Sequence, residues 1–158
     1  MADYIYPAPG VTGVEATLSL AIGGLAALDI PSLQDITVNA SNDVFTWTQL
    51  DLASKKQIAT TATNSLSMNL VLDQLSFFGD STAAVGTAAN KGIFGMSNEK
   101  SLVTFSLYLG DTSAATENQG KTLSGTGFIT GLAPTVSADS PVWVSPITIT
   151  VDGDYTVA

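Results

Sequence analysis

The sequence predicts a mainly β protein: an antiparallel two-sheet β-sandwich or barrel-like domain with one short flanking α-helix and a long projecting hairpin loop. Apolar and polar residues alternate with a period of two in several segments, which is typical of strands with one buried face. One alanine-rich segment breaks this alternation. The length of 158 residues favours a single domain with a hydrophobic core of its own.

The N-terminal residues 1–12 are expected to form an extended arm, because they contain Tyr4, Tyr6 and two prolines without a core-like pattern. We therefore divide the chain into this arm and one domain over residues 13–158. The first strand is predicted over residues 13–22. Its apolar face carries Val14, Ala16, Leu18, Leu20 and Ile22, and its polar face carries Glu15, Thr17 and Ser19.

The segment 39–64 has no obvious core partner and is predicted to be the long hairpin that projects from the sandwich. It contains Phe45, Trp47, Lys55 and Lys56, followed by a run of small polar residues. A loop of this length is uncommon in a compact domain unless it is functional or disordered. Exposed aromatic residues favour a contact with another protein; the alternative is a disordered segment.

Two further strands are predicted over residues 65–73 and 101–109, where apolar residues again occupy every second position. Between them, residues 80–90 are rich in alanine and do not alternate. This pattern predicts one short helix, capped by Asp80 or Ser81 and ended by Gly92.

The C-terminal third predicts the remaining strands. Gly125 and Gly127 indicate a bulge or a close backbone approach in a strand. β-Branched residues follow in the segment 142–151. The residues Asp152-Gly153-Asp154 are typical of a hairpin turn and predict that the last two strands pair with each other.

The composition excludes most catalytic chemistry. The chain has no cysteine, histidine or arginine, which removes thiolate and imidazole ligands, the usual general base and bidentate anion clamps. A pair of catalytic carboxylates remains, but the three glutamates lie in no recognisable motif. The Asp152-Gly153-Asp154 segment lacks the further acids of a calcium loop. We expect no enzymatic activity, no cofactor and no catalytic or metal-binding residues.

The charge and hydropathy predict self-association. A net charge of −9 and an isoelectric point of about 4.1 disfavour stable binding to nucleic acid or to an anionic membrane. Only 12% of residues are charged, whereas 45% are hydrophobic; ordinary domains have roughly 25% charged residues. Much of the surface must therefore be uncharged, which is typical of protein–protein contacts. The start of the chain lacks the pattern of a signal peptide, so we expect a chain made in the cytoplasm.

The order of these segments resembles the major tail protein, or tail tube protein, family of long-tailed bacteriophages. Residues 125–130 match a G-x-G-x-I-T strand, which is followed by a turn with small residues and an acid, and by two strands around Gly153-Asp154. Upstream, residues 56–61 and 64–69 are similar to the hairpin and return strand of that family. The predicted helix after Asp80 and the strand 101–109 stand where the family has its helix and next strand.

The resemblance implies a structural virion protein of the viral tail. In that family, six copies form a ring whose inner sheets close into one barrel, and the rings stack into a hollow conduit for DNA ejection. The implied partners are further copies of the chain and other tail proteins such as the sheath, tape measure, tail terminator and baseplate. DNA would pass through only transiently and non-specifically. The implied location is the virion tail, assembled in the host cytoplasm without a membrane.

The resemblance also implies where the contacts lie. Contacts between rings and between subunits are expected in residues 1–12 and 43–63, with Tyr4, Tyr6, Phe45, Trp47, Lys55 and Lys56 as candidates. Possible acidic residues of the lumen, which would repel DNA, are Glu15, Asp73 and Asp111. The alternative interpretation is that these three carboxylates lie on the outer surface and face solvent.

Two other functions fit the same composition. A carbohydrate-binding or adhesin-like β-sandwich could stack sugars on Trp47 and Trp143, although two tryptophans more often anchor a core or an interface. Another virion component, such as a capsid decoration or baseplate protein, would also be mainly β and non-enzymatic. Open-ended assembly favours a tube subunit, whereas a stable monomer favours a binding module.

Overall fold

The computed structural model describes residues 17–30, 33–51, 53–109 and 121–158. These residues form one antiparallel sheet of nine strands and two short helices. In chain order, the elements are β1 (Thr17–Ile22), β2 (Leu28–Asp29), β3 (Leu33–Trp47), β4 (Lys56–Val71), α1 (Gln74–Phe78), α2 (Ala88–Asn98), β5 (Val103–Leu109), β6 (Lys121–Leu132), β7 (Thr135–Ser137), β8 (Ser140–Val151) and β9 (Thr156–Val157).

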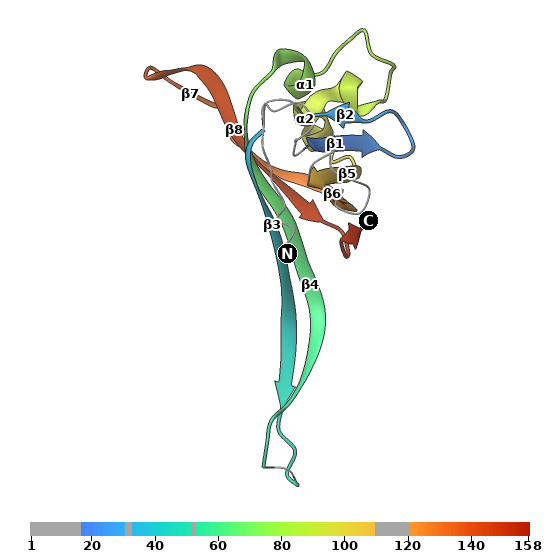
Figure 1. The fold of residues 1–158 in the computed structure, drawn as a ribbon, viewed down its shortest axis with the longest axis vertical. Helices are drawn as coiled ribbons and strands as arrows, with labels where there is room; N and C mark the ends of the chain where they lie inside the picture. The colour runs from blue at the N-terminus through green and yellow to red at the C-terminus, as the bar shows by residue number, and fades with distance from the viewer. Residues whose placement is uncertain (1–16, 31–32, 52, 110–120) are drawn as a thin grey trace, which may run out of the picture.

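The strands follow the order β2-β1-β5-β6-β8-β4-β3, with β7 beside β8 and β9 beside β6. The helices gather with β1, β2, β5 and β6 in a compact body, and β3 and β4 run out of this body as a long hairpin (Figure 1). The mainly β, antiparallel fold with a projecting hairpin is confirmed. The structure differs in detail: hydrogen bonds join the strands into one bent sheet, and two helices are present instead of one.

The hydrophobic core lies on one face of this sheet, under the helices. In the described residues of β1 and β5, and at the body end of β4, every second residue is buried or half-buried there, as the alternation indicates. The buried side chains include Leu18, Leu20, Leu66, Met68, Leu70, Val103, Phe105, Leu107, Ile147 and Ile149 from the strands, and Phe77, Ile93 and Met96 from the helices. Each such side chain contributes roughly 1.5–3 kcal/mol by leaving water.

The predicted helix lies in the wrong place. Most of residues 80–90 form turns, because the Asp80 carboxylate accepts a 2.8 Å hydrogen bond from the Thr82 backbone N–H and holds a local turn instead of capping a helix. The caps are Asp73 for α1 and Thr87 for α2. Gly92 does interrupt helical geometry, with φ of 68°, but α2 resumes after it.

The two helices meet through a glycine pair. A Cβ on Gly92 would lie 2.3 Å from the Gly79 backbone nitrogen, and a Cβ on Gly79 would lie 2.3 Å from the Asn90 carbonyl oxygen. Both glycines have positive φ angles, 68° and 99°. Only residues without a side chain permit this approach, which brings Phe77 of α1 and Ile93 of α2 into one core.

The prediction that the last two strands pair with each other as a hairpin is wrong. β9 pairs with β6, not with β8. β8 and β9 run along β6 as one interrupted strand, and residues 152–155 bulge out between them. Gly153, with φ of 91°, permits the bend. Because Tyr155 turns inward, its ring packs edge-on against Phe105 at 6.2 Å. The aromatic contact and the continued pairing with β6 replace the turn that Asp-Gly predicts.

The expectation for Gly125 and Gly127 is confirmed. A Cβ on Gly127 would lie 2.4 Å from the Thr150 carbonyl oxygen on β8. Gly125 lies opposite Phe105, whose ring occupies the space that a side chain would fill, 2.9 Å from an added Cβ. Both glycines therefore mark close approaches in the middle of the sheet.

Candidate assembly surfaces

The face of β4 that forms the core continues into the hairpin, where it is exposed. Alternate residues of β4 from Ala62 to Leu70 point to the core side, and beyond the register shift this face continues with Ala59, opposite Val44 of β3. Leu66, Met68 and Leu70 are buried within the body, whereas 54% of Val44 is exposed. The same apolar face therefore serves as core at one end of the strand and as surface at the other.

Aromatic residues of β3 lie on the other face of the hairpin. Phe45 lies opposite Ile58, and Trp47 lies opposite Lys56; directly opposite residues share a face of a sheet. The Phe45 and Trp47 rings stack with centroids 5.9 Å apart, and 59% of Phe45 is exposed. The register shift between Asn42 and Val44 places Thr60 and Thr61 of β4 opposite Asp43, so Ile58 lies on the side opposite to Leu66 and joins Phe45 there. We call Phe45, Trp47, Lys56 and Ile58 the hairpin face.

The base of the hairpin is fixed to the C-terminal bulge. The buried side-chain amide of Asn64 donates a 2.8 Å hydrogen bond to the Gly153 carbonyl. The Tyr155 hydroxyl lies 2.9 Å from the Ser65 carbonyl and 2.7 Å from the Asn39 carbonyl, within donating distance of both. Burial raises the pKa of Tyr155, so this donor stays protonated at neutral pH. The hairpin is thus a supported projection.

The hairpin also presents a free strand edge. β3 is the terminal strand of the sheet, and among the described strands it pairs with β4 alone. An edge strand of 15 residues has a row of backbone groups available to a further strand. Such an edge is normally short, charged or covered in a protein that remains monomeric.

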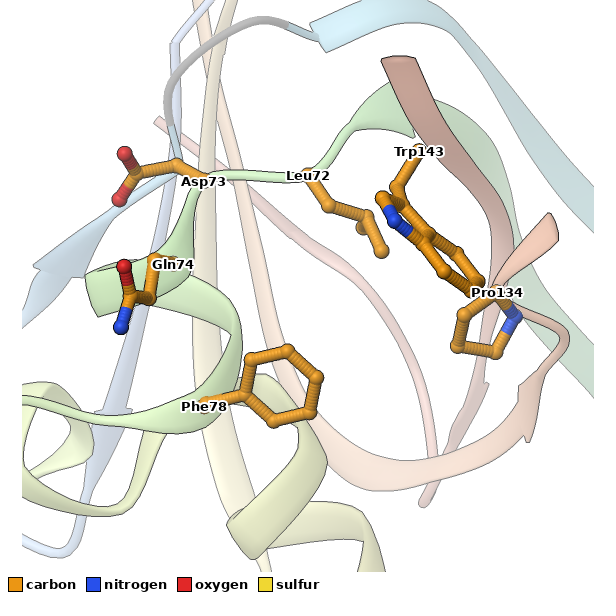
Figure 2. Close-up of a pocket in the computed structure, with 6 residues that line it drawn as sticks. All are labelled: Leu72, Asp73, Gln74, Phe78, Pro134 and Trp143. Atoms are coloured by element: carbon orange, nitrogen blue, oxygen red, sulfur yellow. The ribbon is translucent and has the colours of Figure 1, made fainter. Parts of the chain in front are cut away.

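An apolar pocket lies at the other end of β4 (Figure 2). Its volume is about 330 Å³, and it is lined by Leu72, Asp73, Gln74, Phe78, Pro134 and Trp143. The side chains of Leu72, Phe78, Pro134 and Trp143 surround the hollow. More than half of Phe78 and of Trp143 is exposed, at 62% and 52%. Phe78 also packs against the exposed Phe94 of α2, with ring centroids 5.9 Å apart.

Asp73 provides a fixed negative charge at the rim of this pocket. Its carboxylate accepts hydrogen bonds of 3.0 Å from the Ser76 backbone N–H and from the Ser76 hydroxyl, and so caps α1. The bond from the Ser76 backbone lowers the pKa of Asp73 below its ordinary value, so the group is ionised at neutral pH. In Figure 2, the carboxylate points away from the hollow.

The sheet face opposite the core is lined by hydroxyl side chains. Four directly opposed pairs lie on β4 with β8 and on β5 with β6: Ser65–Thr150, Ser67–Thr148, Thr104–Thr126 and Ser106–Ser124. The Thr130 and Thr150 hydroxyls lie 2.8 Å apart. The face is mostly polar, and it also carries the Asp35 carboxylate opposite Asn69 and the exposed Phe128 opposite Thr150.

The structure gathers some of the predicted contact residues. Phe45, Trp47 and Lys56 share the hairpin face, and Lys55 is exposed next to them. Four candidates lie outside the described residues: Tyr4, Tyr6, Glu15 and Asp111. Asp73 caps a helix beside the pocket, and its assignment to a lumen stays a prediction, as do the roles of the hairpin residues.

Sequence reasoning missed Ile58 and the pocket. Ile58 stands in a run of small polar residues, and its membership of the face follows only from its pairing with Phe45. The pocket joins residues 72–78 to Pro134 and Trp143, which are far apart in the chain. The pair Phe77-Phe78 was an available signal, since two adjacent aromatics in a short helix cannot both point into the core.

The described part of the chain has neither a membrane-spanning helix nor a cluster of metal ligands. None of its helices is both long and apolar enough to cross a membrane. Within the same residues, no group of three or more acidic, cysteine or histidine side chains is arranged to hold a metal ion.

Comparison with known proteins shows a fold-level likeness. No family model matches the chain, and no curated protein matches its sequence. Among solved structures, a chain of the anti-feeding prophage baseplate, 6-fold symmetrised, matches with a TM-score of 0.62 at 10% identity, over 96% of both chains. A chain from the tail of an empty gene transfer agent particle, refined helically with C6 symmetry, matches with a TM-score of 0.60 at 10% identity, over 89% of this chain and 95% of that one.

A third match extends over the whole chain. A chain of the anti-feeding prophage tube-terminating cap has a TM-score of 0.56 at 14% identity, over 100% of this chain and 94% of that one. The chain therefore has the fold of structural components of phage-like tail particles. The resemblance to tail tube proteins that the sequence suggests is confirmed at the level of fold.

Proposed function

We propose that this protein is a structural, non-enzymatic subunit of a tail tube, which self-assembles into stacked hexameric rings around a hollow conduit for DNA. The hairpin face carries the proposal. Phe45, Trp47 and Ile58 form an apolar face of the hairpin beyond the body, and they are exposed. A supported projection with an apolar face is suited to packing against another subunit.

The free edge of β3 supports ring formation. A sheet that ends in a long unpaired strand is completed when a neighbouring copy adds a strand to it, and repetition of this step around an axis closes a barrel without edges. The six-fold symmetry of the particles whose chains share this fold supports a ring of six.

The hydroxyl-lined face is consistent with the wall of the proposed conduit. The core and the helices occupy the other face of the sheet, so we expect β4 and β8 to present Ser65, Ser67, Thr148 and Thr150 to the lumen. Asp35, opposite Asn69 on the same face, and the net charge of −9 add repulsion of DNA to this hydroxyl-lined wall. We expect DNA to slide past such a surface without binding to it.

Electron microscopy of the purified chain tests the proposal. Negative-stain images and size-exclusion profiles are recorded over a range of protein and salt concentrations. Hollow tubes of uniform bore, or six-fold rings, are the expected result. A species that remains monomeric throughout would contradict the proposal, and a glycan screen with Trp47→Ala and Trp143→Ala variants would then test the sugar-binding alternative.

A tube-terminating or baseplate subunit is the second candidate. It is favoured by the matches to chains of the anti-feeding prophage cap and baseplate. The same images separate the two functions. A tube subunit polymerises into open-ended filaments of variable length, whereas a terminator stops at single rings at every concentration.

A further inference from the structure

We infer that the apolar pocket beside Trp143 receives the hairpin face of a second copy of this chain, with Trp47 in the hollow and Lys56 beside Asp73. The inference rests on the proposed function and deepens it, because it names the surface into which the hairpin inserts. Three relationships carry it: the position of the two surfaces, their matching apolar character and their opposite charge.

The two surfaces stand at opposite ends of one strand. Lys56 begins β4, and Leu72 follows its last residue. β4 has 16 residues and a strand rises about 3.3 Å per residue, so the two ends are roughly 50 Å apart. Figure 1 shows the hairpin end and the α1 end at opposite extremes of the molecule. A hairpin therefore cannot reach the pocket of its own chain, and the contact must join two copies head to tail.

The apolar character of the pocket fits an aromatic side chain. Its volume of about 330 Å³ is at the lower end of the roughly 300–1,000 Å³ that is usual for binding sites. Leu72, Phe78, Pro134 and Trp143 surround the hollow. A sugar would need several converging polar groups, yet the Asp73 carboxylate bonds to Ser76 and points away. An indole with little polar surface suits this lining better.

The charges are complementary. The hairpin end carries Lys55 and Lys56, two of the five positive charges of the chain, and one acid, Asp51, so its local charge is positive in a chain of net charge −9. Lys56 lies directly opposite Trp47 on β3. Among the described residues that line the pocket, Asp73 is the one that carries a charge, and it is ionised. When Trp47 enters the hollow, its neighbour Lys56 is brought to the rim that Asp73 occupies.

A head-to-tail contact accounts for open-ended growth. The hairpin face and the pocket are different patches, so each copy offers one free hairpin and one free pocket. A contact of this kind does not saturate at a dimer. Growth along the tube axis then needs no further surface, and β3 stays available for pairing within a ring.

Cysteine cross-linking tests the contact, because the chain has no cysteine of its own. The double variant Lys56→Cys, Gln74→Cys is allowed to assemble and is treated with a short bismaleimide. The expected product on denaturing electrophoresis is a ladder of covalent multimers. The variant Gln57→Cys, Gln74→Cys is the matched control, because Gln57 lies on the opposite face of the same strand; it should give at least tenfold less of the ladder.

A mixture of single variants keeps the test independent of the double variant's folding. Equal amounts of Lys56→Cys and Gln74→Cys chains should yield dimers, and mass spectrometry should find the peptide of residue 56 joined to that of residue 74. Tubes without this cross-link, or with equal cross-linking from Gln57→Cys, would overturn the inference and leave the proposed tube standing. Chains that form neither rings nor tubes would overturn both.

Energetic coupling provides a second measurement. Trp47→Ala and Trp143→Ala should each raise the concentration needed for assembly by about tenfold or more. If the two side chains contact each other across the interface, the combined variant should be little worse than either alone. If the combined variant raised the assembly concentration by the product of the two single effects, the two side chains would act independently. That result would contradict the pairing.

Discussion

The side-chain amide of Asn64 donates a 2.8 Å hydrogen bond to the carbonyl of Gly153. This bond joins the point where the hairpin leaves the body to the bulge between β8 and β9. Asn64 is only 6% exposed, although it lies on the core-facing side of β4, where an apolar residue would be expected. The bond explains why a polar side chain is tolerated at this position.

Replacing Asn64 with Ala should lower the free energy of unfolding by about 1–2 kcal/mol, because the Gly153 carbonyl loses its protein donor and a buried side chain is truncated. Urea unfolding of the dilute, unassembled protein measures this loss. Asn69→Ala is the matched control: Asn69 is exposed and bonds to Asp35 at the surface, so its loss should be below about 0.5 kcal/mol. Equal losses would contradict a special role for the Asn64 bond.

The period-two alternation predicted most of the sheet, since each strand that packs on the core must hide every second side chain. Leu66, Met68 and Leu70 are examples, and their burial follows directly from the sequence. The partner of each strand does not follow in this way. β9 adds to β6 because Tyr155 finds its place against Phe105 and the hairpin base, and a contact between distant residues leaves no local pattern.

The helices show the limit of local propensity. Alanine content favoured residues 80–90, but α1 and α2 lie on either side of most of that segment. Their positions are set by the caps Asp73 and Thr87 and by the close approach of Gly79 to Gly92. The hairpin residues Phe45 and Trp47 could be singled out as candidates, whereas the pocket required the tertiary structure.

Replacing Gly92 with Ala should cost at least about 3 kcal/mol, because strain at a positive φ adds to a clash with the Gly79 backbone. Chemical unfolding, or a loss of soluble protein, reports the effect. Gly86→Ala separates the two causes: its φ is 86°, but no atom lies within 4 Å of the added Cβ. That variant should lose only about 1–2 kcal/mol. Similar losses at both positions would show that the helix contact contributes little.

Because the pKa of Asp73 is lowered in the folded chain, the stability of the fold depends on pH in the acidic range. The Asp73 pKa is lowered relative to the ordinary value of 3.8, chiefly by the Ser76 backbone N–H. The stabilisation is therefore present above pH 3.8 and is lost as the pH falls through the folded pKa. Asp73→Asn keeps a good cap without a titrating group, so it should unfold near the wild-type temperature at pH 7 and lose less between pH 7 and pH 3.

Asp80 provides the control for this titration. Its pKa is also lowered, by hydrogen bonds from the Thr82 side chain and backbone, so Asp80→Asn should leave the Asp73 contribution in place. Thermal unfolding of both variants and the wild type at the two pH values separates the contributions. If Asp73→Asn lost as much stability as the wild type on acidification, ionisation of this cap would have no measurable effect.

The hairpin face should affect assembly and leave the stability of the single chain almost unchanged. Phe45 is 59% exposed and Val44, on the opposite face of the hairpin, is 54% exposed, so Phe45→Ser and Val44→Ser each change unfolding by less than about 1 kcal/mol. Burial of the Phe45 ring between subunits contributes roughly 1.5–3 kcal/mol. Phe45→Ser should therefore raise the concentration for tube formation about tenfold or more, as measured by sedimentation, while Val44→Ser changes it little. Equal effects of the two variants would mean that both faces of the hairpin are buried in the assembly, and that the hairpin face does not direct the contact by itself.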